Sequence, residues 1–283
     1  MSVTDTSLQS SSTDIGQKTL IAGFNATLLF ILAYLTADTA YRLATVLMAR
    51  QLHIPGVWEL SRVKFLIADS SWWRQAVVAV YSVGPLVCLV LGVVAALWFW
   101  QRARLRRGLL KQYLLWLVLH CLNLFFGAMV ADTITQSGFW YVPSWVFLAG
   151  NAVNVAVAVL SGLALLALGY LTAPLFLQSH DSRTLMRYGQ RRRLLGATLF
   201  APWLLGSALI GLAKYPDMST SEWLHLATLV VALVPLAVGS SNELFEFTVD
   251  MPQKTRVASG LLVLVVLVLV LVRVVLGHGL HFG

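Results

Sequence analysis

Long apolar runs, separated by short polar segments, dominate the hydrophobic pattern of the chain. A helix that crosses the hydrocarbon core needs about 20 residues, because each residue rises about 1.5 Å through a layer about 30 Å thick. The runs of that order of length are 20–37, 76–100, 110–131, 145–175, 194–213, 223–239 and 257–276. The pattern predicts an all-α fold, a polytopic transmembrane helical bundle of about seven spans, with six and eight as open alternatives.

The segments around these runs predict further features. The helical spacing of the first run continues to Pro55, so this helix extends past the bilayer, and residues 63–67 then predict a short strand of a β-hairpin. The fourth run is too long for a simple crossing, and the last run is apolar on nearly every side, which predicts contact with lipid. Residues 1–16 are rich in Ser and Thr and predict a disordered tail, which leaves 17–283 as a single multi-span membrane domain.

Composition favours the membrane class and excludes an ordinary soluble domain. Of 283 residues, 58% are hydrophobic and only 11% are charged, whereas soluble domains carry about 25% charged residues. The net charge of +8 would suggest nucleic acid in a soluble protein, but these Lys and Arg residues lie mainly between the apolar runs. Anionic lipid headgroups explain them better. The lipid bilayer is therefore the expected partner, a second membrane protein is a further one, and nucleic acid is not expected.

The distribution of Lys and Arg predicts an orientation. With seven spans, thirteen of them fall on the side of the N-terminus and seven on the other side. Positive charge accumulates in cytoplasmic loops, so we expect a cytoplasmic N-terminus and an outside C-terminus. The five positive charges that follow the first span argue for the opposite orientation. We expect an integral protein of a bacterial plasma membrane.

Polar side chains at membrane depth are the candidate functional groups, because each is costly there unless it is paired or hydrated. An ion pair at spacing i, i+4, a His–Asn pair at spacing i, i+3 and an Asn–Asn pair at the same spacing either fix helix contacts or line a polar path. A histidine within the third run could ligate a metal or haem or relay a proton, with His225 as its partner, or bridge two helices as a neutral imidazole. The candidate set is Asp38, Tyr41, Arg42, Thr45, His120, Asn123, Asn151 and Asn154.

Short motifs with a known mechanism are missing from the sequence. It has no P-loop, no GxSxG, GxGxxG or HExxH motif, and no CxxC or haem-attachment site. Cys88 and Cys121 both lie within apolar runs, where a thiol behaves as a small hydrophobic group. We therefore expect no cofactor.

One stretch resembles a known family. Residues 41–55, which read YRLATVLMARQLHIP, resemble the zinc-site helix of the site-two protease class of intramembrane metalloproteases. That family reads His-Glu-Leu-Gly-His, then an aliphatic stretch and Ala-Arg. The strand at 63–67 and the sequence Gly-Pro-Leu at 84–86 are similar to the family's strands and following helix. The resemblance covers about residues 30–95 and implies an active-site helix, strands beside it, and a following helix that begins with the Gly-Pro-Leu motif.

The same comparison shows departures at the chemical positions. The two zinc-ligand positions hold Tyr41 and Thr45, the general-base position holds Arg42, and the family's asparagine position holds Cys88. The downstream Leu-Asp-Gly that supplies a third ligand is absent. Activation of water by zinc needs neutral imidazoles and a carboxylate, so the resemblance implies a degenerate site without proteolytic chemistry. The family also directs this end of the helix to the cytoplasm, opposite to the charge count.

Three functions follow as expectations. The first is a non-catalytic protein that binds, scaffolds or regulates a membrane partner, with a degenerate metalloprotease-like site. The second is a transporter or channel, which requires the intramembrane Asn and His residues to converge on one hydrated cavity. The third is a cofactor-binding membrane enzyme, which requires His120 and His225 to approach within the distance of a shared ligand.

Overall fold

A computed structural model describes residues 3–106, 108–148, 150–242 and 255–283. Seven helices in this part of the chain are long and apolar enough to cross a membrane. They are Ile15–Gln51, Arg74–Gln101, Leu110–Thr135, Asn151–Gln178, Gly189–Lys214, Thr220–Ser240 and Ser259–Leu276. The predicted helical bundle is confirmed, and the chain is a multi-pass membrane protein.

The first half of the chain forms three spans and a short sheet. Its elements are α1 (Val3–Gln51), β1 (Gly56–Trp58), β2 (Val63–Phe65), η1 (Asp69–Ser71), α2 (Arg74–Gln101), η2 (Ala103–Leu105), α3 (Leu110–Leu122), η3 (Asn123–Gly127), α4 (Ala128–Thr135), η4 (Gly138–Trp140) and α5 (Tyr141–Phe147). The π-helical turn η3 joins α3 and α4 into one span. Helix α1 begins within the segment for which the sequence predicts a tail, and the division into a tail and one domain stays a prediction.

The second half forms four further spans. Its elements are α6 (Asn151–Leu171), α7 (Ala173–Gln178), α8 (Arg183–Met186), α9 (Tyr188–Leu195), η5 (Gly196–Phe200), α10 (Ala201–Lys214), α11 (Thr220–Thr228), α12 (Val230–Ser240), α13 (Ser259–Leu276) and β3 (Leu280–Phe282). The long fourth apolar run is not one helix. It is divided after α5, where Leu148 takes a left-handed φ of 50° and ends the helix, and the span itself begins at Asn151.

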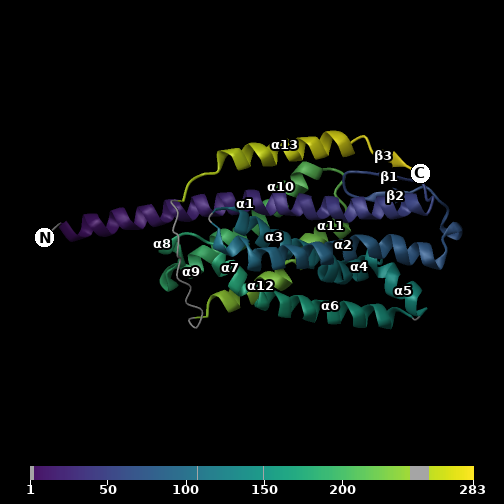
Figure 1. Cartoon of the computed structure of the whole chain (residues 1–283), viewed down its shortest axis with the longest axis horizontal. Coiled ribbons are helices and arrows are strands. Elements are labelled where there is room, and N and C mark those ends of the chain that lie inside the picture. Colours follow the sequence, from purple (N-terminus) through teal and green to yellow (C-terminus); the bar gives the residue numbers. More distant parts are fainter. Residues whose placement is uncertain (1–2, 107, 149, 243–254) are drawn as a thin grey trace.

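The spans differ sharply in how much protein surrounds them. In the span from Leu110 to Thr135, 83% of the most apolar stretch is buried inside the protein. This span packs against α1 and α2 at the centre of the bundle. In α13 the corresponding share is 11%, and this helix lies along one side of the bundle next to α1 and α10 (Figure 1). This low burial supports the predicted lipid contact of the last run.

The connections between spans gather at two ends of the bundle. At one end the backbone N–H of Gly108 donates to Asp181 Oδ2 at 2.8 Å, and the Asn25 amide binds the carbonyl of Arg256 at 2.7 Å. This end holds the two Arg-rich loops and is called the basic end below. At the other end Arg74 donates to the carbonyl of Val146 at 2.6 Å. Seven spans that cross in alternating directions place the loops at the same two ends as the structure does. Which of these ends faces the cytoplasm stays a prediction.

A three-stranded antiparallel sheet covers the second end, which is called the sheet end below. The strand order is β2-β1-β3, and the β1–β2 hairpin confirms the hairpin predicted after the first span. The third strand comes from the far end of the chain, with Gly56 opposite Phe282 and Trp58 opposite Leu280. Figure 1 shows the sheet beside the end of α1, close to the C-terminus.

Candidate functional site

The most concentrated polar chemistry in the described chain is an ion network buried between α1, α10 and α11. Tyr34, Asp38 and Arg42 are spaced four residues apart on α1, so their side chains share one face of that helix. Lys214 is the last residue of α10, and Glu222 lies in the first turn of α11. The short connection between those two helices brings both charges to the α1 face. We call these five residues the ion network.

Each ionic group in the network contacts two or more others. Arg42 Nε lies 2.8 Å from Asp38 Oδ1, and Arg42 Nη2 lies 3.2 Å from Glu222 Oε1. Lys214 Nζ lies 3.0 Å from Asp38 Oδ2 and also pairs with Glu222 Oε1. The Tyr34 hydroxyl donates to Glu222 Oε1 and accepts from Lys214 Nζ at 3.2 Å.

The charges of the ion network balance. Two carboxylates face two cations, and Arg42, Lys214 and Glu222 are each at most 8% exposed. Moving a charged side chain out of water costs roughly several kcal/mol. That cost is offset only where groups of opposite charge surround the side chain with good hydrogen-bond geometry. The paired atoms of the network meet that condition, although Glu222 Oε2 is buried without a hydrogen-bond partner. The network therefore holds α1, α10 and α11 in one arrangement.

A second polar cluster lies next to the network, across the first turns of α11. Asp132 on α4 accepts hydrogen bonds at Oδ1 from Ser221 Oγ at 2.8 Å and lies 2.8 Å from His225 Nε2. Its Oδ2 accepts from the backbone N–H of Phe139 at 2.8 Å. Asn123 in η3 donates to the carbonyl of His225 at 2.5 Å. This cluster therefore joins the third span to the sixth.

Ser221, His225 and Asp132 are the residue types of a nucleophilic triad, but their arrangement is different. In a triad the imidazole contacts the acid through one ring nitrogen and the serine through the other. Here His225 Nε2 faces Asp132 at 2.8 Å and Ser221 Oγ at 3.4 Å, so a single nitrogen meets both groups. That nitrogen cannot donate to the acid and accept the serine proton at once. The geometry suits a helix contact.

The helix that resembles a zinc-site helix packs tightly against α2. Gly84 of α2 approaches α1 so closely that a methyl group added there would lie 2.9 Å from Thr45 Oγ1 and 3.0 Å from the Tyr41 carbonyl oxygen. The Thr45 hydroxyl donates back to the Tyr41 carbonyl at 3.1 Å. One turn along, Cys88 Sγ lies 3.6 Å from the carbonyl of Ala37. Tyr41 and Thr45 are thus in contact with protein at this helix crossing.

The histidine predicted as a ligand or relay lies in an aromatic environment. The His120 ring centroid is 4.5 Å from that of Phe30, 5.6 Å from that of Tyr34 and 6.1 Å from that of Trp116. Within the described chain its Nε2 has no hydrogen-bond partner, and no group of three or more His, Cys, Asp or Glu side chains is placed to hold a metal ion. His225 is engaged with Asp132 rather than with this ring.

The structure divides the predicted set of polar residues into separate contacts. Asp38 and Arg42 belong to the ion network, Asn123 to the Asp132 cluster, and Asn154 donates to Ser144 Oγ at 2.6 Å between α6 and α5. Asn151 is exposed. The structure therefore does not bring these residues together at one place, because asparagines spaced along different helices satisfy whichever neighbour each helix meets.

Three members of the ion network are absent from the predicted set: Tyr34, Lys214 and Glu222. Lys214 and Glu222 flank the short connection between the fifth and sixth runs, at the same level of the bundle as Asp38 and Arg42. Charged residues of opposite sign at the ends of neighbouring spans are a sequence pattern from which this ion pairing could have been predicted. Tyr34 carried no such signal, since a tyrosine within an apolar run is typical of packing alone.

Comparisons with known proteins gave no match: no family model, no curated protein and no solved structure is similar to the chain.

Proposed function

We propose that this membrane protein is non-catalytic and acts by binding a second membrane protein, and that its α1–α2 contact is a closed, degenerate counterpart of a zinc-protease site. The observation that carries the proposal is the packing of Tyr41 and Thr45 against Gly84. A catalytic zinc site keeps one coordination position open for water or substrate. Here the corresponding space is occupied by the side chains themselves.

Arg42, which stands at the position of the general base in the family that the helix resembles, supports the same conclusion. Arg42 is 8% exposed and is turned into the ion network, where Asp38 and Glu222 bind it. A guanidinium stays protonated at any ordinary pH, so it cannot accept a proton from water. Its charge would also repel a zinc ion.

A transporter or channel is less well supported by the same geometry. That function needs the intramembrane amides to face a common hydrated path. In the described chain Asn25 binds the segment before α13, Asn123 binds α11, and Asn154 binds α5. Each amide thus serves a different helix contact, as interhelical asparagines commonly do.

Metal analysis of the purified protein tests the catalytic half of the proposal. After dialysis against zinc-containing buffer and then buffer alone, we expect far less than one zinc per chain and no cleavage of a transmembrane peptide substrate. Stoichiometric zinc that disappears in Asp132→Asn or His120→Ala would contradict the proposal, because it would show a ligand set that includes those residues.

Photo-crosslinking tests the binding half. The lipid-facing helices provide the available area, with Leu163 on α6 56% exposed and Leu267 on α13 61% exposed. With a photoreactive residue at each position in native membranes, we expect one protein adduct of defined mass from one face and lipid adducts from the other. Lipid adducts alone from both faces, and from the neighbouring Leu160 and Leu271, would contradict a protein partner.

A further inference from the structure

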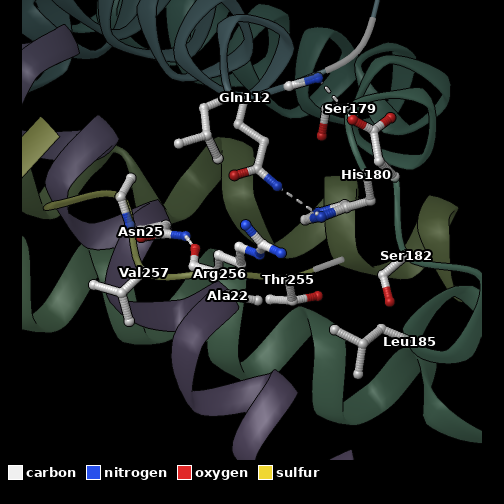
Figure 2. Close-up of a pocket in the computed structure, with 14 residues that line it drawn as sticks. Ala22, Asn25, Gln112, Ser179, His180, Ser182, Leu185, Thr255, Arg256 and Val257 are labelled. Atoms are coloured by element: carbon white, nitrogen blue, oxygen red, sulfur yellow. Dashed lines mark hydrogen bonds between the residues drawn. The ribbon is translucent and has the colours of Figure 1, made fainter. Parts of the chain in front are cut away.

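A cavity of about 320 Å³ opens at the basic end of the bundle. It lies between α1, the start of α3, the loop that follows α7, and the segment that leads into α13 (Figure 2). The Asn25 side chain fixes one wall, because it donates to the carbonyl of Arg256 at 2.7 Å and accepts from the N–H of Ala258 at 3.0 Å. The backbone that carries Arg256 is therefore held in place by α1.

The free hydrogen-bonding groups around this cavity are mainly donors. Figure 2 shows the Arg256 guanidinium directed into the space between Asn25 and His180, and no hydrogen bond or ion pair of this side chain occurs within the described chain. The hydroxyls of Ser182 and Thr255 also line the cavity. Gln112 uses its nitrogen on His180 Nδ1 at 2.9 Å, and its Oε1 is buried without a partner and is not accessible from the cavity.

The one carboxylate on the wall is already neutralised. Asp181 Oδ1 pairs with Lys111 Nζ at 2.5 Å, and Oδ2 accepts from the backbone of Gly108 at 2.8 Å. The cavity thus presents the net positive charge of Arg256. The adjoining loops, which carry Arg102, Arg104 and Arg106 and then Arg187, Arg191, Arg192 and Arg193, add to the positive potential of this end.

The remaining lining is apolar and continues toward lipid. Ala22, Leu109, Leu185 and Val257 line the cavity. Val257 is 52% exposed and precedes α13, whose outer surface faces the bilayer. A ligand for this site should therefore have an anionic polar end and an apolar end. Basic pockets between transmembrane helices bind anionic lipid headgroups by the same combination.

We propose that this cavity is a binding site for a glycerol phosphate group, supplied by an anionic glycerophospholipid such as phosphatidylglycerol. The phosphate binds Arg256, which can offer two parallel N–H donors, and accepts hydrogen bonds from Ser182 and Thr255. The acyl chains lie along α13. This site is independent of the α1–α2 contact, so it does not rest on the proposed function.

Lipid titration of the delipidated protein in neutral detergent tests the proposal by native mass spectrometry. We expect phosphatidylglycerol to bind at least tenfold more tightly than phosphatidylcholine. The Arg256→Gln variant should lose about tenfold in affinity for phosphatidylglycerol, the order expected for a charge-assisted hydrogen bond. Ser182→Asp should also lose affinity, since it places a negative charge at the phosphate while it keeps a side chain suited to a helix N-cap.

Arg273→Gln is the matched control. Arg256 precedes the start of α13, whereas Arg273 lies near the far end of that helix, where it is 3.6 Å from Asp217 and 44% exposed. The loss of Arg273 should leave the affinity unchanged. Glycerol phosphate without acyl chains, titrated in the same way, separates the two sources of the group. Weak binding of glycerol phosphate assigns the site to the lipid, and equal binding assigns it to a soluble ester. Equal affinity for both lipids, or full affinity in Arg256→Gln, would overturn the proposal.

Discussion

The two ends of the bundle use polar residues in opposite ways. At the sheet end Asp38, Arg42, Lys214 and Glu222 face one another and leave no net charge. At the basic end the Arg256 guanidinium is directed into a cavity and has no ionic partner within the described chain. One network oxygen, Glu222 Oε2, is buried without a hydrogen-bond partner. Arg256, by contrast, is exposed and directs its charged group into a cavity that a ligand can enter.

This difference teaches that the cost of a polar group at membrane depth does not by itself indicate a ligand site. A closed, balanced set supports the fold, since removal of any member exposes the rest to a large desolvation cost. An open set has its donors free and loses little stability when one is removed. Mutations at the two ends should therefore separate into effects on stability and effects on binding.

The largest effect should follow from Lys214→Met. This change leaves two carboxylates against one cation in a buried space, so we expect a loss of about 3–5 kcal/mol in the free energy of unfolding. The double variant Lys214→Met/Glu222→Gln restores the charge balance and should recover part of that loss. Unfolding in detergent micelles, followed by circular dichroism, measures both.

The surface pair of Arg62 and Glu59 is the control for this prediction. Its atoms are as close as those of the buried pairs, at 2.7 Å, but Arg62 is 66% exposed. Arg62→Gln should cost about 0–1 kcal/mol. Equal losses in Arg62→Gln and Lys214→Met would show that the ion network does not stabilise the bundle.

A smaller effect should appear at the basic end as a dependence on pH. Burial, together with the nearby Lys111 ammonium, lowers the pKa of His180 from its ordinary value of about 6.5 to about 3. The unfolded chain binds a proton at higher pH than the folded chain, so stability is lost as pH falls through 6.5. We expect a loss of about 2 kcal/mol between pH 7 and pH 5.

His180→Gln should remove this part of the pH dependence, because glutamine can keep the contact with Gln112 without titrating. Asp181 and Lys111 remain in both proteins and act as an internal reference. Melting curves at several pH values compare the two. An unchanged slope in His180→Gln would assign the acid sensitivity to another group.

The smallest effect should come from the asparagines of α6. Asn154 is 1% exposed and bonds to Ser144, whereas Asn151, one turn earlier, is exposed. Asn154→Ala should cost about 0.6–2 kcal/mol, the range for one interhelical hydrogen bond, and Asn151→Ala should cost nothing measurable. Thermal melting of the pair is sufficient, and equal losses would mean that the contact between α5 and α6 is not the source.

The sequence predicts the architecture well and the pairing of elements less well. Run lengths identify all seven spans, because a bilayer demands apolar segments of a fixed length. They do not reveal β3, since Leu280, His281 and Phe282 form too short a segment to show a period. They also miss the break at Leu148, which depends on a single left-handed residue within an apolar run.

The candidate site is predicted only where its residues are neighbours on one helix. Asp38 and Arg42 are identified by their i, i+4 spacing, but the ion network needs Lys214 and Glu222 from far along the chain. Likewise the cavity at the basic end combines α1 with residues 255–258, which no local pattern connects. Which distant residues meet in a helical bundle depends on how whole helices pack. The sequence of a single helix therefore does not predict these contacts.

The strand β3 restrains the C-terminal end of α13, a helix that is otherwise largely exposed. This helix has little contact along its length, yet Asn25 of α1 holds its beginning and the β1–β3 pairing holds its end beside the exit of α1. A helix restrained at both ends cannot rotate or drift away in the plane of the bilayer.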